Sequence, residues 1–154
     1  MHKCIVALHN VRSVHNVGSI FRTADAAGVE KIILCGYTPT PLDRFGRERK
    51  DFNKVSLGAE KSVAWEYSKT LASVIKKLKG EDFVILAIEQ SRQSLSLFDF
   101  KIPANKNVAL ILGNEVEGID PETRGRLDGL VKIPMDRKQS LNVSVASGIA
   151  MYLF

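Results

Sequence analysis

One short stretch, Val108-Ala109-Leu110-Ile111-Leu112, decides the fold of this chain, because it contains no polar side chain. A continuous apolar run of this length is typical of a β-strand that is buried on both faces, as in the centre of a parallel sheet. Phe83–Ile88 has the same character, and two earlier runs, Lys3–Leu8 and Lys31–Cys35, are rich in isoleucine, valine or leucine. These runs predict the core strands of a parallel sheet.

Segments with helical periodicity separate these strands. Apolar residues recur at helical spacing from His15 to Ala27, and Gly28 is the kind of residue that ends a helix. The remaining expected elements are helices at Asp51–Leu57, Ser68–Leu78, Pro121–Leu127 and Leu141–Phe154, a strand at Leu130–Ile133, and a long loop from Gly36 to Phe52. Because strands alternate with helices, we predict an α/β fold with a mostly parallel sheet flanked by helices. We expect residues 1–154 to form a single domain.

Composition and cysteine usage narrow the class of protein. With 154 residues, 45% of them hydrophobic and 25% charged, the chain is long enough to bury a core of its own. No apolar run is long enough to span a bilayer and no signal peptide is recognisable, so we expect a cytoplasmic protein with no membrane partner. Cys4 and Cys35 lie in apolar runs without the spacing of metal ligands, so we expect two buried thiols and no metal site.

The chain is basic, with a formal net charge of +5 at pH 7. This charge suits a polyanionic partner such as RNA without requiring one. Basic residues gather in two segments, with phenylalanines interleaved in the first: Arg44, Arg47, Arg49, Lys50 and Lys54 with Phe45 and Phe52, and then Lys76, Lys77 and Lys79. The first cluster is either a solvated loop or an RNA contact, and the pattern alone leaves both interpretations open.

Several familiar kinds of site are excluded. The segment Gly113–Gly118 has the glycine spacing of a phosphate-binding loop, but Ile119 and Asp120 stand where that motif requires lysine and serine or threonine. The glycine fingerprint of dinucleotide binding, the serine elbow of hydrolases and the paired-histidine motif of zinc proteases do not occur in the chain. The chemistry must therefore come from other polar residues.

Three groups of polar residues follow the carboxyl ends of predicted strands, where open α/β sheets bind their ligands. They are Asn16, Ser19 and Arg22 after the first strand, Gly113, Asn114 and Glu115 after Val108–Leu112, and Ser140 and Asn142 after Leu130–Ile133. Each residue alone has a purely structural interpretation: Asn16 or Ser140 would cap a helix, Arg22 would be a surface arginine, and Glu115 would lie in the first turn of a short helix. Because all three groups are expected at one edge of one sheet, their convergence favours a binding site.

At these positions the chain resembles a known family. The segments Asn16–Thr23, Leu112–Gly118, and Ile133–Met135 with Ser140–Ala146 are similar to the three motifs of SpoU-type (TrmH-like) RNA methyltransferases of the SPOUT superfamily. The resemblance implies a C-terminal trefoil knot, a homodimer, and methyl transfer from S-adenosylmethionine to a ribose 2′-hydroxyl of structured RNA. It covers essentially the whole chain, without the N-terminal RNA-recognition domain of some members, so we expect tRNA rather than rRNA as the substrate.

The resemblance also implies a role for each motif residue. Arg22 would bind the target phosphate and help to activate the hydroxyl, while the nucleotide and the cofactor would be positioned by Asn16, Glu115, Ser140 and Asn142. The cofactor pocket would be lined by Gly113, Asn114, Ile133, Met135 and Leu141, and no metal is implied. One departure from the family pattern is the loop Asp136–Gln139, which is short and lacks a glycine.

Three other functions compete with this interpretation. One is an rRNA ribose methyltransferase, which differs only in substrate. Another is a catalytically silent RNA-binding protein on the same scaffold, against which the intact set of polar motif residues argues. The last is an α/β enzyme that acts on a small acidic metabolite.

Overall fold

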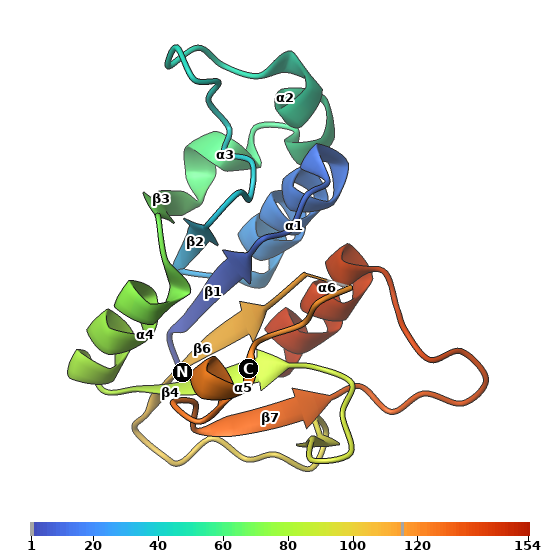
Figure 1. Ribbon diagram of the computed structural model, residues 1–154. Coiled ribbons are helices and arrows are strands. Elements are labelled where there is room, and N and C mark those ends of the chain that lie inside the picture. Colours follow the sequence, from blue (N-terminus) through green and yellow to red (C-terminus); the bar gives the residue numbers. More distant parts are fainter. Residues whose placement is uncertain (1, 115) are drawn as a thin grey trace.

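The apolar runs of the sequence form the centre of a seven-stranded β-sheet in the computed structural model, which describes residues 2–114 and 116–154 (Figure 1). The strand order is β3-β2-β1-β6-β4-β7-β5, and every neighbouring pair is parallel. The strands are β1 (Cys4–His9), β2 (Lys31–Cys35), β3 (Ala64–Ser68), β4 (Phe83–Ile88), β5 (Leu95–Ser96), β6 (Asn107–Leu112) and β7 (Gly129–Lys132). The predicted parallel α/β fold is confirmed.

Strand β6 lies in the middle of the sheet, as its uninterrupted apolar sequence predicts. Residues 108–111 are completely buried, which is expected where helices cover both faces of a parallel sheet. Leu112 at its carboxyl end lies opposite Leu8 of β1 on one side and opposite Ile88 of β4 on the other. These three strands therefore end at the same edge of the sheet.

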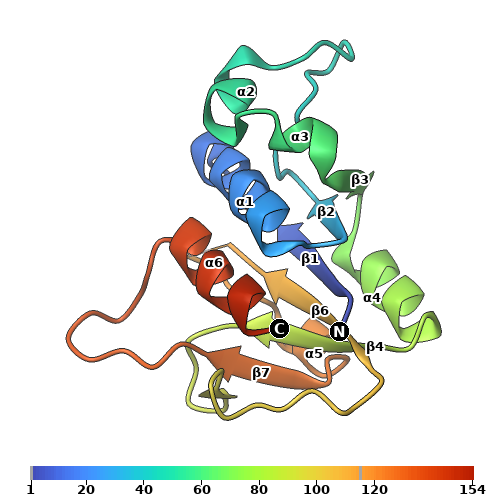
Figure 2. The same cartoon turned by 180° about the vertical axis from the view of Figure 1, so that it is seen from behind.

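Helices cover the sheet in two layers (Figures 1 and 2). The first layer contains α1 (Val14–Ala27) and α6 (Val143–Leu153), with α2 (Lys50–Ser56) and α3 (Ala59–Ser62) packed on α1. The second contains α4 (Leu71–Gly80) and α5 (Pro121–Arg124). Because side chains alternate along a strand, Val6 of β1 packs into the first layer and Ile5 into the second. Each layer thus closes an apolar core of its own.

The sequence did not predict the two edge strands, β3 and β5, or the short helix α3. Strand β3 pairs only with β2, and its alternating polar and apolar residues do not form the continuous run of a buried strand. Strand β5 has two residues and α3 has four, so neither shows a usable periodicity. The helix expected from Ser68 begins at Leu71 instead, because Ser68 ends β3 and the Thr70 hydroxyl caps the helix.

The N-cap residues of α1 and α6 differ from the capping residues that the sequence suggested. Gly28 ends α1 in the left-handed conformation with φ of 76°, as predicted. The N-cap of α1 is Ser13, whose hydroxyl accepts a hydrogen bond from the backbone N–H of Asn16, so Asn16 is not the cap. Helix α6 is capped by Asn142 and not by Ser140. The Asn16 and Ser140 side chains are therefore not committed to capping.

The structure buries Phe52 and both cysteines and leaves Phe45 exposed. Phe52 on α2 is fully buried, with its ring edge-on to that of Phe21 at 5.2 Å between centroids, so it cannot contact RNA. Phe45, by contrast, is exposed in the loop before α2. Cys4 and Cys35 are buried and free, as predicted, and burial raises the pKa of each thiol to about 12.

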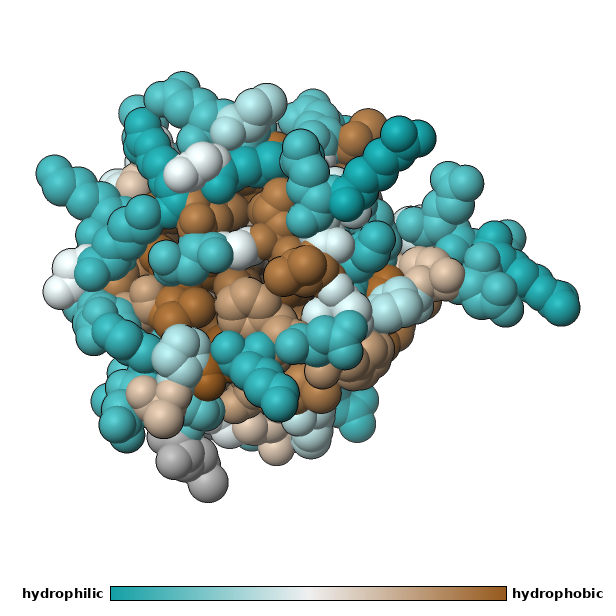
Figure 3. Space-filling view, turned by 90° about the horizontal axis from the view of Figure 1, so that it is seen from below, coloured by the Kyte–Doolittle hydropathy of each residue, from teal (hydrophilic) through white to brown (hydrophobic). Residues whose placement is uncertain are grey.

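Some apolar side chains stay at the surface. Figure 3 shows one face on which they gather inside a hydrophilic border. Exposed apolar residues include Leu95 and Phe98 at or near β5, and Tyr152 and Leu153 near the end of α6. Within residues 2–114 and 116–154, no helix has both the length and the apolar character needed to cross a bilayer. The C-terminal trefoil knot stays a prediction, since strand order does not specify how the chain threads.

Candidate functional site

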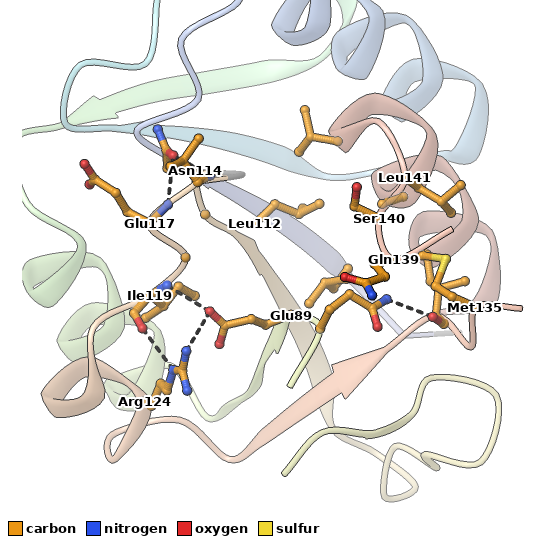
Figure 4. Close-up of a pocket in the computed structure, with 18 residues that line it drawn as sticks. Glu89, Leu112, Asn114, Glu117, Ile119, Arg124, Met135, Gln139, Ser140 and Leu141 are labelled. Carbon is orange, nitrogen blue, oxygen red and sulfur yellow. Dashed lines mark hydrogen bonds and ion pairs between the residues drawn. The ribbon is translucent and has the colours of Figure 1, made fainter. Parts of the chain in front are cut away.

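A cavity of about 390 Å³ opens at the carboxyl edge of the sheet, where β4, β6 and β7 end (Figure 4). Its walls come from the connection after β4, the connection between β6 and α5, and the connection between β7 and α6. Parallel strands bring their carboxyl ends to one edge, so segments far apart in the chain meet there. The volume falls within the range of roughly 300–1,000 Å³ that is usual for small-molecule sites.

All the residues predicted for the cofactor pocket line this cavity. Gly113 and Asn114 come from the connection after β6, while Ile133, Met135 and Leu141 come from the connection before α6. Ser140, from the predicted catalytic group, lines it as well. The second and third sequence motifs therefore meet in one cavity.

The other described residues of the predicted catalytic group do not line the cavity. Asn16 on α1 is joined to the third motif, because Nδ2 of Asn142 donates a hydrogen bond to Oδ1 of Asn16 at 3.3 Å. Arg22 is exposed farther along α1 and is not among the described residues that line the cavity. Glu115 lies outside the described residues. The structure thus links the first motif to the third through Asn16, and it leaves Arg22 outside the cavity wall.

The side chain of Asn114 holds the loop after β6 in shape. It is buried, and its Nδ2 donates hydrogen bonds to the Asn10 carbonyl oxygen at 3.1 Å and to the Tyr37 hydroxyl oxygen at 2.8 Å. Its Oδ1 accepts hydrogen bonds from the backbone N–H groups of Val116 and Glu117 at 2.8 and 3.1 Å. The amide has two donors and two acceptor lone pairs, and all are engaged within the protein. Asn114 therefore shapes the cavity and does not offer its amide to a ligand.

Two glycines allow this loop to fold back on itself. A Cβ atom on Gly113 would lie 3.1 Å from Ile119 Cγ1 and 3.2 Å from the Gly118 carbonyl oxygen. Gly118 has φ of 65°, and a Cβ atom there would lie 2.2 Å from Oε1 of Glu89. A side chain at Gly113 would press on Gly118 and Ile119, and one at Gly118 would displace the Glu89 carboxylate, so either would disturb the cavity wall.

Glu89, directly after β4, was not predicted as a site residue. Its side chain is only 12% exposed. Oε1 accepts hydrogen bonds from the Ile119 backbone N–H at 3.0 Å and from Nη2 of Arg124 at 2.9 Å, as Figure 4 shows. Oε2 is buried and has no hydrogen-bond partner among the described residues. Because a buried polar atom without a partner costs free energy, this oxygen indicates a ligand donor in the cavity. The signal in the sequence was an acidic residue immediately after the apolar run Phe83–Ile88.

Two glutamines complete the polar part of the wall. Nε2 of Gln90 donates a hydrogen bond to the Ile133 carbonyl oxygen at 2.8 Å, which ties the connection after β4 to the third motif. Gln139, the last residue of the short loop that departs from the family pattern, also lines the cavity. The short loop therefore still reaches the site.

His9 is the last residue of β1 and lies close to the negative charges of Glu117 and Asp120, which follow β6. Its Nδ1 is buried without a hydrogen-bond partner among the described residues. Burial lowers the pKa of His9 below its ordinary value of 6.5, and the negative charges of Asp120 and Glu117 partly oppose this shift. His9 is consequently neutral at pH 7.

The chain is similar to known RNA methyltransferases over nearly its whole length. A family model described as the SpoU rRNA Methylase family matches residues 3–152. A Ralstonia nicotianae protein named 23S rRNA (guanosine-2′-O-)-methyltransferase RlmB is 36% identical over 150 residues, which are 96% of this chain and 56% of that protein. The Escherichia coli protein of the same name is 34% identical over 149 residues, 96% of this chain and 58% of that protein. The chain thus spans somewhat more than half the length of these curated relatives.

Solved structures share the fold. The AdoMet-bound rRNA methyltransferase from Sinorhizobium meliloti has a TM-score of 0.86 at 29% identity, covering 99% of this chain and 57% of that chain. A TrmH/SpoU tRNA modifying enzyme from A. aeolicus has a TM-score of 0.80 at 31% identity, covering 99% of this chain and 73% of that chain. The sheet and its helical layers are therefore those of SpoU and TrmH proteins.

Proposed function

The chain belongs to the SpoU rRNA methylase family, and from this premise we propose that it transfers the methyl group of S-adenosylmethionine to a ribose 2′-hydroxyl of RNA. One observation carries the proposal: two motifs that are far apart in the sequence meet in a single cavity of about 390 Å³. A cavity of this size at the carboxyl edge of a parallel sheet is suited to a nucleoside ligand.

The residues of the cavity fit S-adenosylmethionine. Met135, Leu141 and Ala146 offer an apolar wall for the adenine ring. The unpartnered Oε2 of Glu89 offers an acceptor to a ribose hydroxyl, and its carboxylate favours a positively charged sulfonium in the same cavity. When bound, the cofactor supplies a methyl group that a nucleophilic oxygen can attack. The protein contributes by holding donor and acceptor in register.

The RNA side of the reaction is assigned to the first motif and to the start of α6. Arg22 is exposed, and its guanidinium offers N–H donors and no acceptor, so it cannot serve as a general base. Its proposed role is to bind the target phosphate and to stabilise the negative charge that develops on the ribose oxygen. The nucleotide would be positioned by the hydrogen-bonded pair Asn16 and Asn142, by Ser140 and by Glu115.

We propose rRNA as the substrate class, in place of the tRNA expected from the sequence. The support is that the relatives from Ralstonia nicotianae and Escherichia coli are both named for 23S rRNA. The tRNA alternative retains one specific observation, which is the A. aeolicus tRNA modifying enzyme at 31% identity. Transfer of labelled methyl groups to rRNA and to tRNA distinguishes the two substrates.

We further propose a homodimer in the cytoplasm, with α6 at the interface. The sequence predicted that this apolar helix is buried in the core or against another subunit. It buries Val143 and Ala150 within the chain, while Val145, Tyr152 and Leu153 stay exposed. These exposed side chains support a self-association surface, and sedimentation of the purified protein would test it.

The test of the activity combines cofactor binding with methyl transfer. Calorimetry should detect binding of S-adenosylmethionine, and labelled methyl groups should appear in rRNA more than in tRNA. Arg22→Ala should abolish transfer, whereas Lys101→Ala, which removes an exposed positive charge before β6, should not. A protein that bound RNA but neither bound the cofactor nor transferred a methyl group would be the silent RNA-binding alternative.

A further inference from the structure

The segment between β2 and α2 displays an aromatic ring that the cavity does not use. Phe45 is 66% exposed in a turn closed by an antiparallel bridge between Leu42 and Glu48. The guanidinium carbon of Arg44 lies 4.8 Å from the centroid of its ring, and that of Arg47 lies 4.9 Å from it. In Figure 1 this segment is the loop at the top of the view that runs from β2 to α2.

The turn is preorganised by the side chain of Asp43. Oδ1 of Asp43 accepts hydrogen bonds from the backbone N–H groups of Phe45 at 2.8 Å and Arg47 at 2.9 Å, and Oδ2 pairs with Nε of Arg47 at 3.0 Å. The Asp43 backbone N–H donates in turn to the Arg47 carbonyl oxygen at 2.8 Å. The hydrogen bond from the Arg47 backbone lowers the pKa of Asp43, so the brace is ionised at neutral pH. Phe45 is therefore held outward by a rigid turn.

A second exposed phenylalanine lacks this setting. Phe98 is 57% exposed near β5, the strand at the opposite edge of the sheet from β3, and no guanidinium lies over its ring within the described ranges. Exposure of an aromatic ring is thus not peculiar to Phe45. Among the residues that the structure describes, only Phe45 combines an exposed ring, two guanidiniums over that ring and a braced turn.

This surface is connected to the cavity through the start of the same segment. The hydroxyl oxygen of Tyr37 accepts the hydrogen bond from Asn114, the residue that shapes the cavity loop, at 2.8 Å. Tyr37 is itself 49% exposed, with the guanidinium carbon of Arg12 at 5.6 Å from its ring centroid. One exposed aromatic–arginine pair therefore lies beside the cavity, and the Phe45 ring with its two arginines lies farther along the same segment between β2 and α2.

We propose that Phe45, Arg44 and Arg47 form a stacking site for an unpaired nucleobase of RNA, with the guanidiniums contacting the adjacent phosphates. A nucleotide in a single strand combines a free aromatic face with negative charge. Its base would take the place of a guanidinium over the Phe45 ring, and the displaced guanidinium would pair with an adjacent phosphate. In a duplex the base faces are already stacked, so a duplex offers only its backbone and grooves. The inference rests on the proposed function and adds that the substrate region is unpaired.

The test compares two RNA probes and four proteins. The probes are a hairpin with an unpaired loop and a blunt duplex with the same number of phosphates. Phe45→Ala should weaken hairpin binding by about tenfold, roughly the effect of losing one stacked base, and should leave duplex binding unchanged. Phe45→Trp should retain wild-type hairpin affinity, and the matched control Phe98→Ala should behave as wild type. Because Phe45 carries no charge, its removal should not change the salt dependence of binding.

The outcomes separate this inference from the proposed function. Hairpin binding by Phe45→Ala at wild-type strength would overturn the stacking site while leaving methyl transfer intact. Equal weakening of hairpin and duplex would also overturn it, because binding would then not depend on an unpaired base. Wild-type protein that bound neither RNA would refute the RNA substrate itself, and with it this surface. An unchanged unfolding midpoint for Phe45→Ala is expected from its exposure and excludes misfolding as the cause.

Discussion

Replacing Glu89 with glutamine separates the two tasks that its carboxylate performs. Through Oε1 it holds the cavity loop by accepting hydrogen bonds from the Ile119 N–H and from Arg124. Its other oxygen, Oε2, is buried without a hydrogen-bond partner among the described residues, in a side chain that lines the cavity. In Glu89→Gln the amide oxygen can keep the two loop contacts, and the amide nitrogen then takes the place of Oε2. A donor replaces an acceptor where the ligand is expected.

The size of each effect follows from the contacts. Charge-assisted hydrogen bonds contribute about 1.5–3 kcal/mol and neutral ones about 0.5–1.5 kcal/mol, so the loop contacts should weaken by roughly 1 kcal/mol. We take the low end of the range for charge-assisted hydrogen bonds, because the Arg124 side chain is 30% exposed and partly hydrated. Loss of the charged acceptor facing the ligand should cost about 1.5–3 kcal/mol, which raises the Kd for S-adenosylmethionine by roughly tenfold to a hundredfold. Glu89→Ala, which keeps neither contact, should lower the free energy of unfolding by about 3 kcal/mol.

The assay pairs isothermal titration calorimetry with urea unfolding. Glu81→Gln is the matched control, because it makes the same change of charge at an exposed position at the end of α4. Glu89→Gln that stayed folded and bound the cofactor as tightly as the control would refute the assignment of Oε2 to the ligand. Glu89→Ala as stable as the control would refute the role of Oε1 in holding the loop.

Four other predictions concern individual side chains elsewhere in the chain. Arg22→Ala should lose methyl transfer while binding S-adenosylmethionine with unchanged Kd, because Arg22 is not among the described residues that line the cavity; lost cofactor binding would contradict this. Phe52→Ala should destabilise the fold by about 3–5 kcal/mol in urea unfolding, because a fully buried ring leaves a cavity. Burial lowers the pKa of His9, so its contribution to stability is complete above its ordinary pKa of 6.5 and is lost as pH falls through the lowered pKa; His9→Gln should flatten that part of a pH–stability curve. Cys4 and Cys35, with pKa values of about 12, should resist iodoacetamide in the native protein at pH 8 and react once it is unfolded, as mass spectrometry would show.

The sheet could be predicted where burial is complete, and prediction failed where burial is partial. Strand β6 is covered on both faces, so every residue from 108 to 111 had to be apolar and the run was unmistakable. Strand β3 lies at an edge and has no fully buried residue; the sequence pattern assigns residues 64–67 to no element and places Ser68 at the start of an expected helix. The cap of α6 failed for another reason: Ser140 and Asn142 are both good capping residues, and only the path of the connection decides between them.

The sequence by itself determined the five strands β1, β2, β4, β6 and β7, that the sheet is parallel, and that the second and third motifs meet at its carboxyl edge. The reason is that the apolar pattern of a segment reflects the burial of that segment alone. Only the tertiary structure decided what those residues contact. In it the amide of Asn114 is fully hydrogen-bonded within the protein, Oε2 of Glu89 is buried without a partner among the described residues, and Phe52 is buried while Phe45 is exposed. These outcomes depend on distances between segments that are far apart in the chain, and a local pattern carries no record of such distances.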